Sequence, residues 1–200
     1  FNEPWCSSFL SYDLGIHAPG IKNKRMALQV AHHLLLAHGL ALPVLKKNAP
    51  NAKHGIVLNF TPAYPASNTH ADYLAAELSD AETGHWFIQP LMEKTYPQSV
   101  LNAYPEDRPL ILENDMKIIG SPIDFLGVNY YTRSVVRANK IGENPYYQEV
   151  KLPDVDRTAM DWEIYPKALT RLLTQLNHKY QLPPIFITEN GAAFDDRLEN

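Results

Sequence analysis

The chain of 200 residues is 45% hydrophobic and 20% charged, a composition typical of a globular domain that excludes disordered and fibrous classes. Its formal net charge of −4 gives no electrostatic footprint for nucleic acid or an anionic membrane, so we expect neither partner. The single cysteine, Cys6, cannot form an intramolecular disulfide, and we predict one domain over residues 1–200 that is stabilised by a packed core. These properties leave the compartment and the oligomeric state open, with a cytoplasmic location favoured.

The first part of the chain predicts an extended N-terminal end, a loop over residues 15–20 and then a helix. This helix begins an uncharged run of twenty residues, Met26 to Leu45, which is long enough to cross a membrane. Six residues within the run would leave polar groups unsatisfied in lipid or interrupt the helix: Gln29, His32, His33, His38, Gly39 and Pro43. We therefore predict a buried helix of a globular protein that ends near Gly39.

The remaining elements alternate between strands and helices. Short apolar runs predict strands at Gly55–Phe60, 125–131 and 185–188, the first of them buried on both faces as in a parallel sheet. Helical periodicity predicts helices at 72–78 and 165–180, and scattered prolines predict mixed helix and loop over 86–112. Strand, long crossover and strand is the pattern of an α/β fold whose active site lies at the carboxyl ends of the strands.

Two glutamates lie where an apolar segment stops. Glu3 follows Asn2 near the start of the chain, and Glu189 directly follows the third predicted strand. A carboxylate at the end of a buried strand is poorly solvated, so its surroundings can aim it at a substrate. Two such carboxylates are what glycoside hydrolysis requires, one as an acid and one as a nucleophile or base. A single glutamate here would more often be a helix-cap or surface residue, but the pair, each beside an asparagine, favours a site.

Two segments resemble the signature motifs of glycoside hydrolase family 1, the retaining β-glucosidases: Phe1-Asn2-Glu3-Pro4-Trp5 and Ile187-Thr188-Glu189-Asn190-Gly191. Further segments resemble the family in the same order, at residues 17–20, 32–35, 86–90, 96–97, 125–131 and 162–166. The resemblance covers the whole chain and implies an α/β fold that is part of a (β/α)8 TIM barrel, about strands four to seven of the eight.

The resemblance also implies roles for individual residues. Glu3 would be the general acid/base and Glu189 the nucleophile of a covalent, retaining mechanism, with carboxyl groups about 5–5.5 Å apart. Asn2 would bind the 2-hydroxyl of the glucose unit, with Asn129 lining the same pocket. Tyr131 would donate a hydrogen bond to Glu189 and hold its orientation.

On the leaving-group side, the resemblance implies that Trp162 is an aromatic platform and that Asn59 lines the same side of the pocket. The sequence departs from the family in this region, because Asp161 stands where the family usually has glycine before the tryptophan. We expect this difference to alter the loop and the preference for the leaving group.

The implied substrate is a β-glucoside or cello-oligosaccharide, and the implied mechanism needs neither a metal nor a cofactor. Three alternatives stay open: a 6-phospho-β-glucosidase or β-galactosidase of the same family, a non-catalytic carbohydrate-binding relative, and an inactive fragment. Strands one to three and strand eight of the family barrel have no counterpart in the chain. We therefore expect it to be the central part of a longer enzyme.

Other residues that could bind ligands have simpler interpretations. The histidines at 32, 33 and 38 lack a His-Glu-x-x-His spacing and a Cys/His cluster, so we predict packed histidines and no metal site. Asn59 also begins a glycosylation sequon, but its place at a strand end before Pro62 argues against modification. Cys6 is expected to be a small packed residue.

Overall fold

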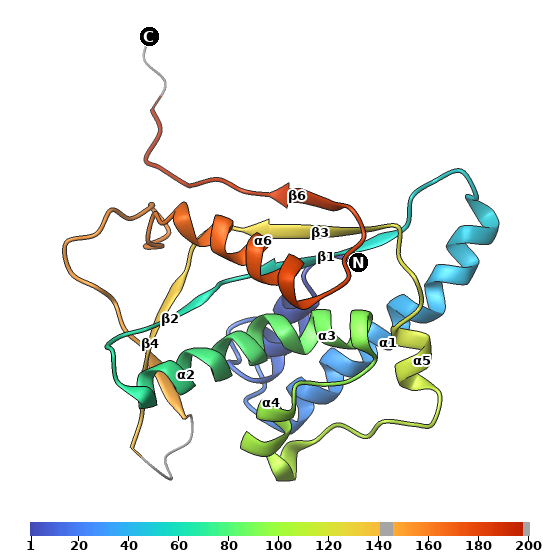
Figure 1. The fold of residues 1–200 in the computed structure, drawn as a ribbon, viewed down its shortest axis with the longest axis horizontal. Coiled ribbons are helices and arrows are strands. Elements are labelled where there is room, and N and C mark those ends of the chain that lie inside the picture. Colours follow the sequence, from blue (N-terminus) through green and yellow to red (C-terminus); the bar gives the residue numbers. More distant parts are fainter. Residues whose placement is uncertain (141–145, 198–200) are drawn as a thin grey trace.

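The main sheet of the protein holds three parallel strands in the order of the chain. The computed structural model describes residues 1–140 and 146–197. Within these ranges the strands lie in the order β1 (Gly55–Phe60), β3 (Phe125–Tyr130) and β6 (Ile185–Glu189), side by side along the upper part of the molecule in Figure 1. All three predicted strands are thereby confirmed, and a parallel α/β architecture with them.

The N-terminal segment extends this sheet at the free edge of β1. Asn2 forms a parallel bridge with Val57, and the Glu3 amide donates to the Val57 carbonyl at 3.0 Å. Beyond Asn2 the predicted extended end is wrong, because residues 4–12 are helical and include a π-helix at Cys6–Leu10. Glu3 turns the chain with a φ of 45°, and Pro4 then occupies the first helical position, where its missing N–H costs nothing.

Each face of the sheet has its own neighbours. The side chains of Ile56, Leu58 and Phe60 are buried on one face of β1, whereas Val57 and Asn59 are only half-buried on the other. The prediction that this strand is buried on both faces is therefore wrong. In the described ranges most helices lie below the three strands in the view of Figure 1.

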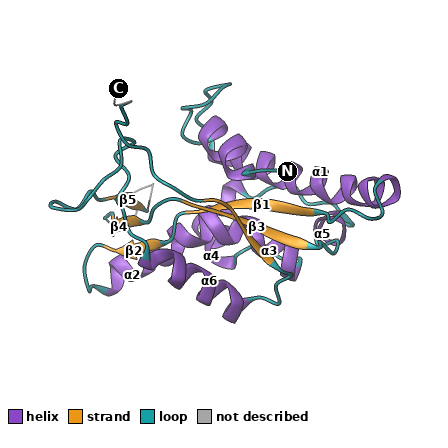
Figure 2. Ribbon diagram, turned by 90° about the horizontal axis from the view of Figure 1, so that it is seen from above, coloured by secondary structure: helices purple, strands orange, loops and turns teal. Residues whose placement is uncertain are grey.

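Six α-helices lie within the described ranges. Figure 2 shows α1 and α6 on either side of the strands when the molecule is seen from above. Their buried leucines and those of the strands form one core, which includes Leu28, Leu35, Leu126, Leu172 and Leu176. The helices are α1 (Lys24–Asn48), α2 (His70–Asp80), α3 (Trp86–Glu93), α4 (Gln98–Ala103), α5 (Asp115–Ile119) and α6 (Lys167–Lys179).

Helix α1 is longer than the sequence predicts. It begins after Asn23, whose side chain accepts a hydrogen bond from the Met26 amide, and it continues through Pro43 to Asn48 instead of ending near Gly39. Gly39 allows a close approach to α5, because a Cβ atom there would lie 2.3 Å from the Ile118 carbonyl oxygen. By length and composition α1 could also cross a membrane, but one of its faces packs into the core.

A second, smaller sheet was not predicted. Its strands are β2 (Ala63–Pro65), β4 (Ser134–Ala138) and β5 (Tyr147–Glu149), with β4 in the middle. Two of these strands have only three residues each, too few for an alternating pattern to be recognised. Their packing against α2 forms a separate apolar cluster around Ala76 and Val136.

Candidate active site

The carboxyl ends of the parallel strands bring the predicted polar residues to one edge of the sheet. Asn129 lies at the end of β3 and Glu189 at the end of β6, directly opposite each other in the strand register. Asn59 lies opposite Asn129 on the other side, at the end of β1, and Asn2 and Glu3 follow at the edge beyond β1. Parallel strands therefore gather residues from both ends of the chain.

Glu3 is held in an unusual backbone conformation. Its φ of 45° is uncommon for a residue other than glycine, and such strain is found most often at functional sites. Its carboxylate accepts hydrogen bonds from the Asn129 amide at 2.8 Å and from the Cys6 thiol at 3.2 Å. Both carboxylate oxygens thus have a partner that fixes their direction.

Asn129 connects the two sides of the site. Its Nδ2 group donates to Glu3 Oε1 and, at 3.3 Å, to Asn2 Oδ1. Its Oδ1 atom accepts a hydrogen bond from the Thr188 hydroxyl at 2.6 Å. The side chain is 1% exposed, so these bonds satisfy a buried amide and fix which end is the donor.

Glu189 is oriented by a tyrosine from the neighbouring strand. The Tyr131 hydroxyl donates to Glu189 Oε2 at 2.7 Å, which is the contact that the resemblance implies. This hydrogen bond and burial, together with the nearby charges of Glu189 and Glu3, raise the pKa of Tyr131 to about 12, so the hydroxyl stays a donor. The pairing of β3 with β6 shifts its register between Val128 and Asn129, so that Thr188 has no paired residue on β3. Thr188 and Glu189 therefore both lie beside Asn129.

The charges of Glu3 and Glu189 both influence the Cys6 thiol. Burial, the hydrogen bond to Glu3 and the charges of both Glu3 and Glu189 raise the pKa of the Cys6 thiol to about 12. Cys6 therefore stays protonated and donates to Glu3, which corrects the expectation of a merely packed residue. Cys6 and Thr188 are the contacts that sequence reasoning missed, since a thiol or hydroxyl beside a signature glutamate carries no pattern of its own.

Trp162 borders the Glu189 side of the site. Its ring centroid lies 5.4 Å from that of Tyr131, within the usual range of aromatic pairs, and the residue is 39% exposed. Asn59 lies at the end of β1, and its buried Oδ1 atom has no hydrogen-bond partner among the described residues. Both side chains could therefore offer a surface or an acceptor to a ligand.

His32 and His38 are buried as predicted, but His33 is exposed, so the prediction of a packed residue is wrong there. His32 is buried between the Tyr96 hydroxyl, 2.8 Å from Nδ1, and Asp115, 3.1 Å from Nε2. His33 is exposed and lies 3.0 Å from the Gln29 amide. Across residues 1–140 and 146–197, no three His, Cys, Asp or Glu side chains come together as a metal site.

The arrangement supplies two carboxylates, an amide and a phenol at one edge of a sheet. Comparison with known proteins shows where else this occurs. The sequence model of glycosyl hydrolase family 1 matches residues 1–200. Beta-glucosidase A of Acetivibrio thermocellus is 40% identical over 200 residues, which cover 98% of this chain and 45% of that protein. A beta-glucosidase of Agrobacterium sp. is 37% identical over 202 residues, which cover 100% of this chain and 44% of that protein.

Solved structures agree with these matches. A β-glucosidase from Exiguobacterium marinum superposes with a TM-score of 0.92 at 37% identity, covering 100% of this chain and 46% of that chain. Virulence factor SghA of Agrobacterium tumefaciens, in complex with its substrate analogue salicin, gives a TM-score of 0.94 at 36% identity over 100% of this chain and 44% of that chain. The chain thus spans less than half the length of the relatives it matches, which corresponds to part of their barrel.

Proposed function

Because the chain belongs to glycosyl hydrolase family 1, we propose that its residues supply the two reacting carboxylates for retaining hydrolysis of terminal β-D-glucosides. The observation that carries this proposal is the hydrogen-bonded path between Glu3 and the end of β6. Glu3 binds Asn129, and Asn129 binds Thr188, which directly precedes Glu189. The substrate would be a β-glucoside or a cello-oligosaccharide.

In the first step, a carboxylate oxygen of Glu189 attacks the anomeric carbon and forms a glycosyl ester. Glu3 gives its proton to the glycosidic oxygen, and the leaving group departs as a neutral alcohol. Tyr131 binds Oε2 of Glu189, whereas Oε1 has no hydrogen-bond partner among the described residues. Oε1 is therefore the atom that attacks. The hydrogen bond from Tyr131 fixes the direction of the carboxylate.

In the second step, Glu3 takes a proton from water, and the water oxygen attacks the anomeric carbon and displaces Glu189. The product keeps its β configuration because each step inverts the carbon once. Asn2 would bind the 2-hydroxyl of the glucose unit, where a hydrogen bond gains strength in the transition state. Asn129 would line the same subsite, while Trp162 and Asn59 would contact the leaving group.

The proposal is tested in a chimeric enzyme in which these 200 residues replace the matching segment of Acetivibrio thermocellus β-glucosidase A. The reagent is 2,4-dinitrophenyl 2-deoxy-2-fluoro-β-D-glucoside. Its fluorine slows both formation and hydrolysis of the glycosyl ester, but its good leaving group keeps formation faster than hydrolysis, so the ester accumulates. We expect the fluoroglucosyl group on Glu189, detected by mass spectrometry of the peptide that contains it. A label on another residue, or turnover of aryl glucosides without any label, would contradict the proposal.

Variants separate the two carboxylates. Glu189→Gln should abolish formation of the glycosyl ester, whereas Glu3→Gln should retain it for substrates with good leaving groups, which need little protonation. Azide should restore turnover in Glu3→Ala and give a β-glucosyl azide. Glu113→Gln, at an exposed position outside the site, is the control. Equal losses in the Glu3 and Glu189 variants for every leaving group would reject these roles, and binding of glucosides without turnover would favour a carbohydrate-binding protein.

A further inference from the structure

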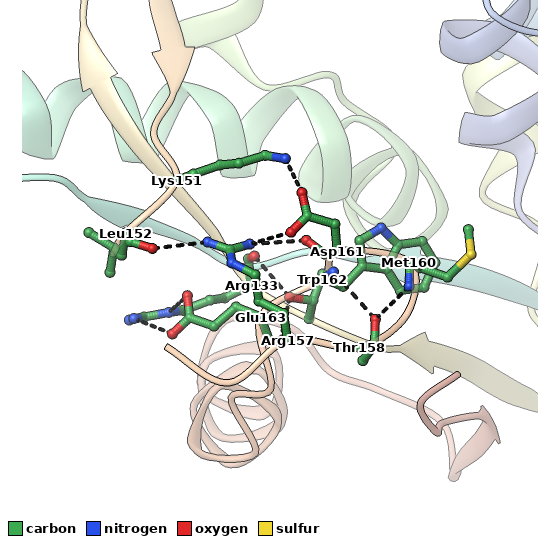
Figure 3. Close-up of polar contacts among 10 residues, drawn as sticks. Arg133, Lys151, Leu152, Arg157, Thr158, Met160, Asp161, Trp162 and Glu163 are labelled. Carbon is green, nitrogen blue, oxygen red and sulfur yellow. Dashed lines mark hydrogen bonds and ion pairs between the residues drawn. The ribbon is translucent and has the colours of Figure 1, made fainter. Parts of the chain in front are cut away.

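Trp162 lies on a tight loop between β5 and α6. Arg157 and Glu163 form an antiparallel bridge at its base, and the Thr158 amide donates to the Trp162 carbonyl at 2.9 Å. The Thr158 hydroxyl accepts from the amides of Met160 at 3.2 Å and Trp162 at 3.3 Å (Figure 3). The loop is therefore a short hairpin with Asp161 beside its tip, directly before the tryptophan.

The residue after Trp162 is anchored to the end of β3. Glu163 accepts two hydrogen bonds from Arg133, at 3.0 and 2.8 Å, and these side chains are only 10% and 12% exposed. The Thr132 hydroxyl also donates to the Glu163 carbonyl at 2.8 Å. Paired, partly buried and bidentate contacts of this kind hold a fixed geometry. The backbone on the C-terminal side of Trp162 is thus tied to the segment between β3 and β4, which carries Tyr131.

The residue before Trp162 is held in a different way. Asp161 has a φ of 61°, in the left-handed region that favours glycine, and it carries a charge that glycine would lack. Its carboxylate forms an ion pair with Lys151, and Arg157 Nη1 lies 3.6 Å from its Oδ1 atom (Figure 3). Arg157 also donates to the Asp161 carbonyl at 3.0 Å and to the Leu152 carbonyl at 3.1 Å. The charge thus connects the loop to the segment that follows β5.

We propose that Asp161 is a positioning residue that uses its ion pairs with Lys151 and Arg157 to hold Trp162 on the leaving-group side of the site. This inference rests on the proposed function, because it assigns to Asp161 the control of affinity for the leaving group of the glucoside. Rotation about the Asp161 backbone would swing the next residue, and Trp162 is exposed enough to move unless both of its neighbours are fixed. The Lys151 and Asp161 side chains are 70% and 53% exposed, so the effect is modest and sensitive to salt.

The test uses the chimera and a control at a matched position. Asp161→Asn removes the charge but retains a residue that tolerates left-handed backbone, and Asp161→Gly removes both the charge and the strain. Asp154→Asn is the control, because Asp154 is exposed, has a φ of 56° and forms no ion pair within the described ranges. Folding of each variant is checked by its thermal midpoint.

We expect both Asp161 variants to lower kcat/KM for cellobiose by about two- to fivefold, the range of an exposed ion pair. The kcat for 2,4-dinitrophenyl β-glucoside should stay unchanged where hydrolysis of the glycosyl ester limits it, because the leaving group has then departed. Sodium chloride at about 0.5 M should lower kcat/KM of the unmodified chimera toward that of Asp161→Asn and leave the variant unaffected. Unchanged kcat/KM in Asp161→Asn, or an equal loss in Asp154→Asn, would overturn the proposal.

A double-mutant cycle tests the partner. The combined effect of Lys151→Gln and Asp161→Asn on kcat/KM should be smaller than the product of the single effects, because the second change removes an interaction that is already lost. Independent effects would contradict the assigned ion pair.

A measurement without turnover separates this inference from the proposed function. In the chimera labelled with 5-fluorotryptophan, the fluorine resonance of Trp162, assigned by its loss in Trp162→Phe, should shift with salt in the unmodified protein. It should not shift in Asp161→Asn. The same salt response in both proteins would reject the positioning role even if the chimera proved inactive, and inactivity with the expected response would reject only the proposed function.

Discussion

Asn129 and Tyr131 show how two residues separated by a single position at one strand end bind different carboxylates. Asn129 binds Glu3, which lies 126 residues away, and Tyr131 binds Glu189, which lies 58 residues away. Both contacts involve a charge-bearing acceptor in a partly buried place, where a hydrogen bond is stronger than one between neutral groups. The end of β3 therefore determines the direction of both carboxylates.

The Tyr131 hydroxyl can be removed without changing the ring that contacts Trp162. In the chimera, Tyr131→Phe should lower kcat/KM for aryl β-glucosides about ten- to a hundredfold, as expected for the loss of a hydrogen bond to a charged group. Tyr146→Phe removes a surface hydroxyl that donates to the Ala103 carbonyl and should leave kcat/KM unchanged. Steady-state kinetics of both variants makes the comparison. An effect of Tyr131→Phe no larger than that of Tyr146→Phe would show that the bond does not matter for Glu189.

At the scale of elements, the junction of α2, the following π-helix (Ala81–His85) and α6 contains two half-buried titratable groups whose pKa values shift in opposite directions. Burial, together with the charge of Lys179, lowers the pKa of His85 to about 4, and the His85 ring lies 2.8 Å from the Tyr180 hydroxyl. Burial raises the pKa of Asp80 to about 6, although Asp80 accepts a hydrogen bond from the Ala63 amide. Both groups are therefore more easily uncharged in the folded protein than in water.

These two groups predict opposite dependences of stability on pH. Between about pH 4 and 6.5 the unfolded chain binds a proton at His85 that the folded protein does not, so stability falls as the pH is lowered through this window. Between about pH 4 and 6 the folded protein holds a proton on Asp80 that the unfolded chain releases, so this contribution is lost as the pH rises. Each group can change the slope by up to about 1.4 kcal/mol per pH unit.

We therefore expect His85→Gln to make the thermal midpoint of the chimera fall less on acidification from pH 6.5 to 4.5, and Asp80→Asn to make it fall more. Both substitutions keep a polar group that can form the local hydrogen bond. Calorimetry at several pH values gives the comparison. Changes of the same sign in the two variants would contradict the assigned shifts.

At the scale of the whole molecule, the sheet has two edges and one face without a covering layer in the described ranges. Phe186 and Ile187 of β6 are 55% and 44% exposed, and β1 has only the short Asn2 bridge beyond it. In a closed barrel such edges are paired, whereas exposed edges can associate with other chains. Because these edges are unpaired, the prediction that residues 1–200 form one independent domain remains to be tested.

The 200-residue chain expressed alone should be aggregated or molten and should show no β-glucosidase activity above background. Burial contributes about 25 cal/mol per Å² of apolar surface and ordering costs about 1–2 kcal/mol per residue, so a partly covered sheet lacks the usual margin. Size-exclusion chromatography, binding of a hydrophobic dye and an aryl β-glucoside assay test this. A soluble monomer with a cooperative thermal transition and measurable turnover would refute it.

The sequence by itself determined the three parallel strands, the positions of α1, α2 and α6, and the location of the two glutamates at strand ends. These features depend on short-range patterns: apolar runs such as Gly55–Phe60, helical periodicity, and motifs whose residues are neighbours in the chain. For the same reason the family could be recognised from two short segments.

Only the tertiary structure decided how those residues meet. The bonds of Asn129 to Glu3 and Thr188, the continuation of α1 past Gly39 and the second sheet depend on contacts between distant segments. Asp161, which has a left-handed backbone, likewise forms ion pairs with Lys151 and Arg157 that only the structure reveals. Local propensity cannot encode such contacts, because the free energy that stabilises them arises when packing removes water from groups far apart in the sequence.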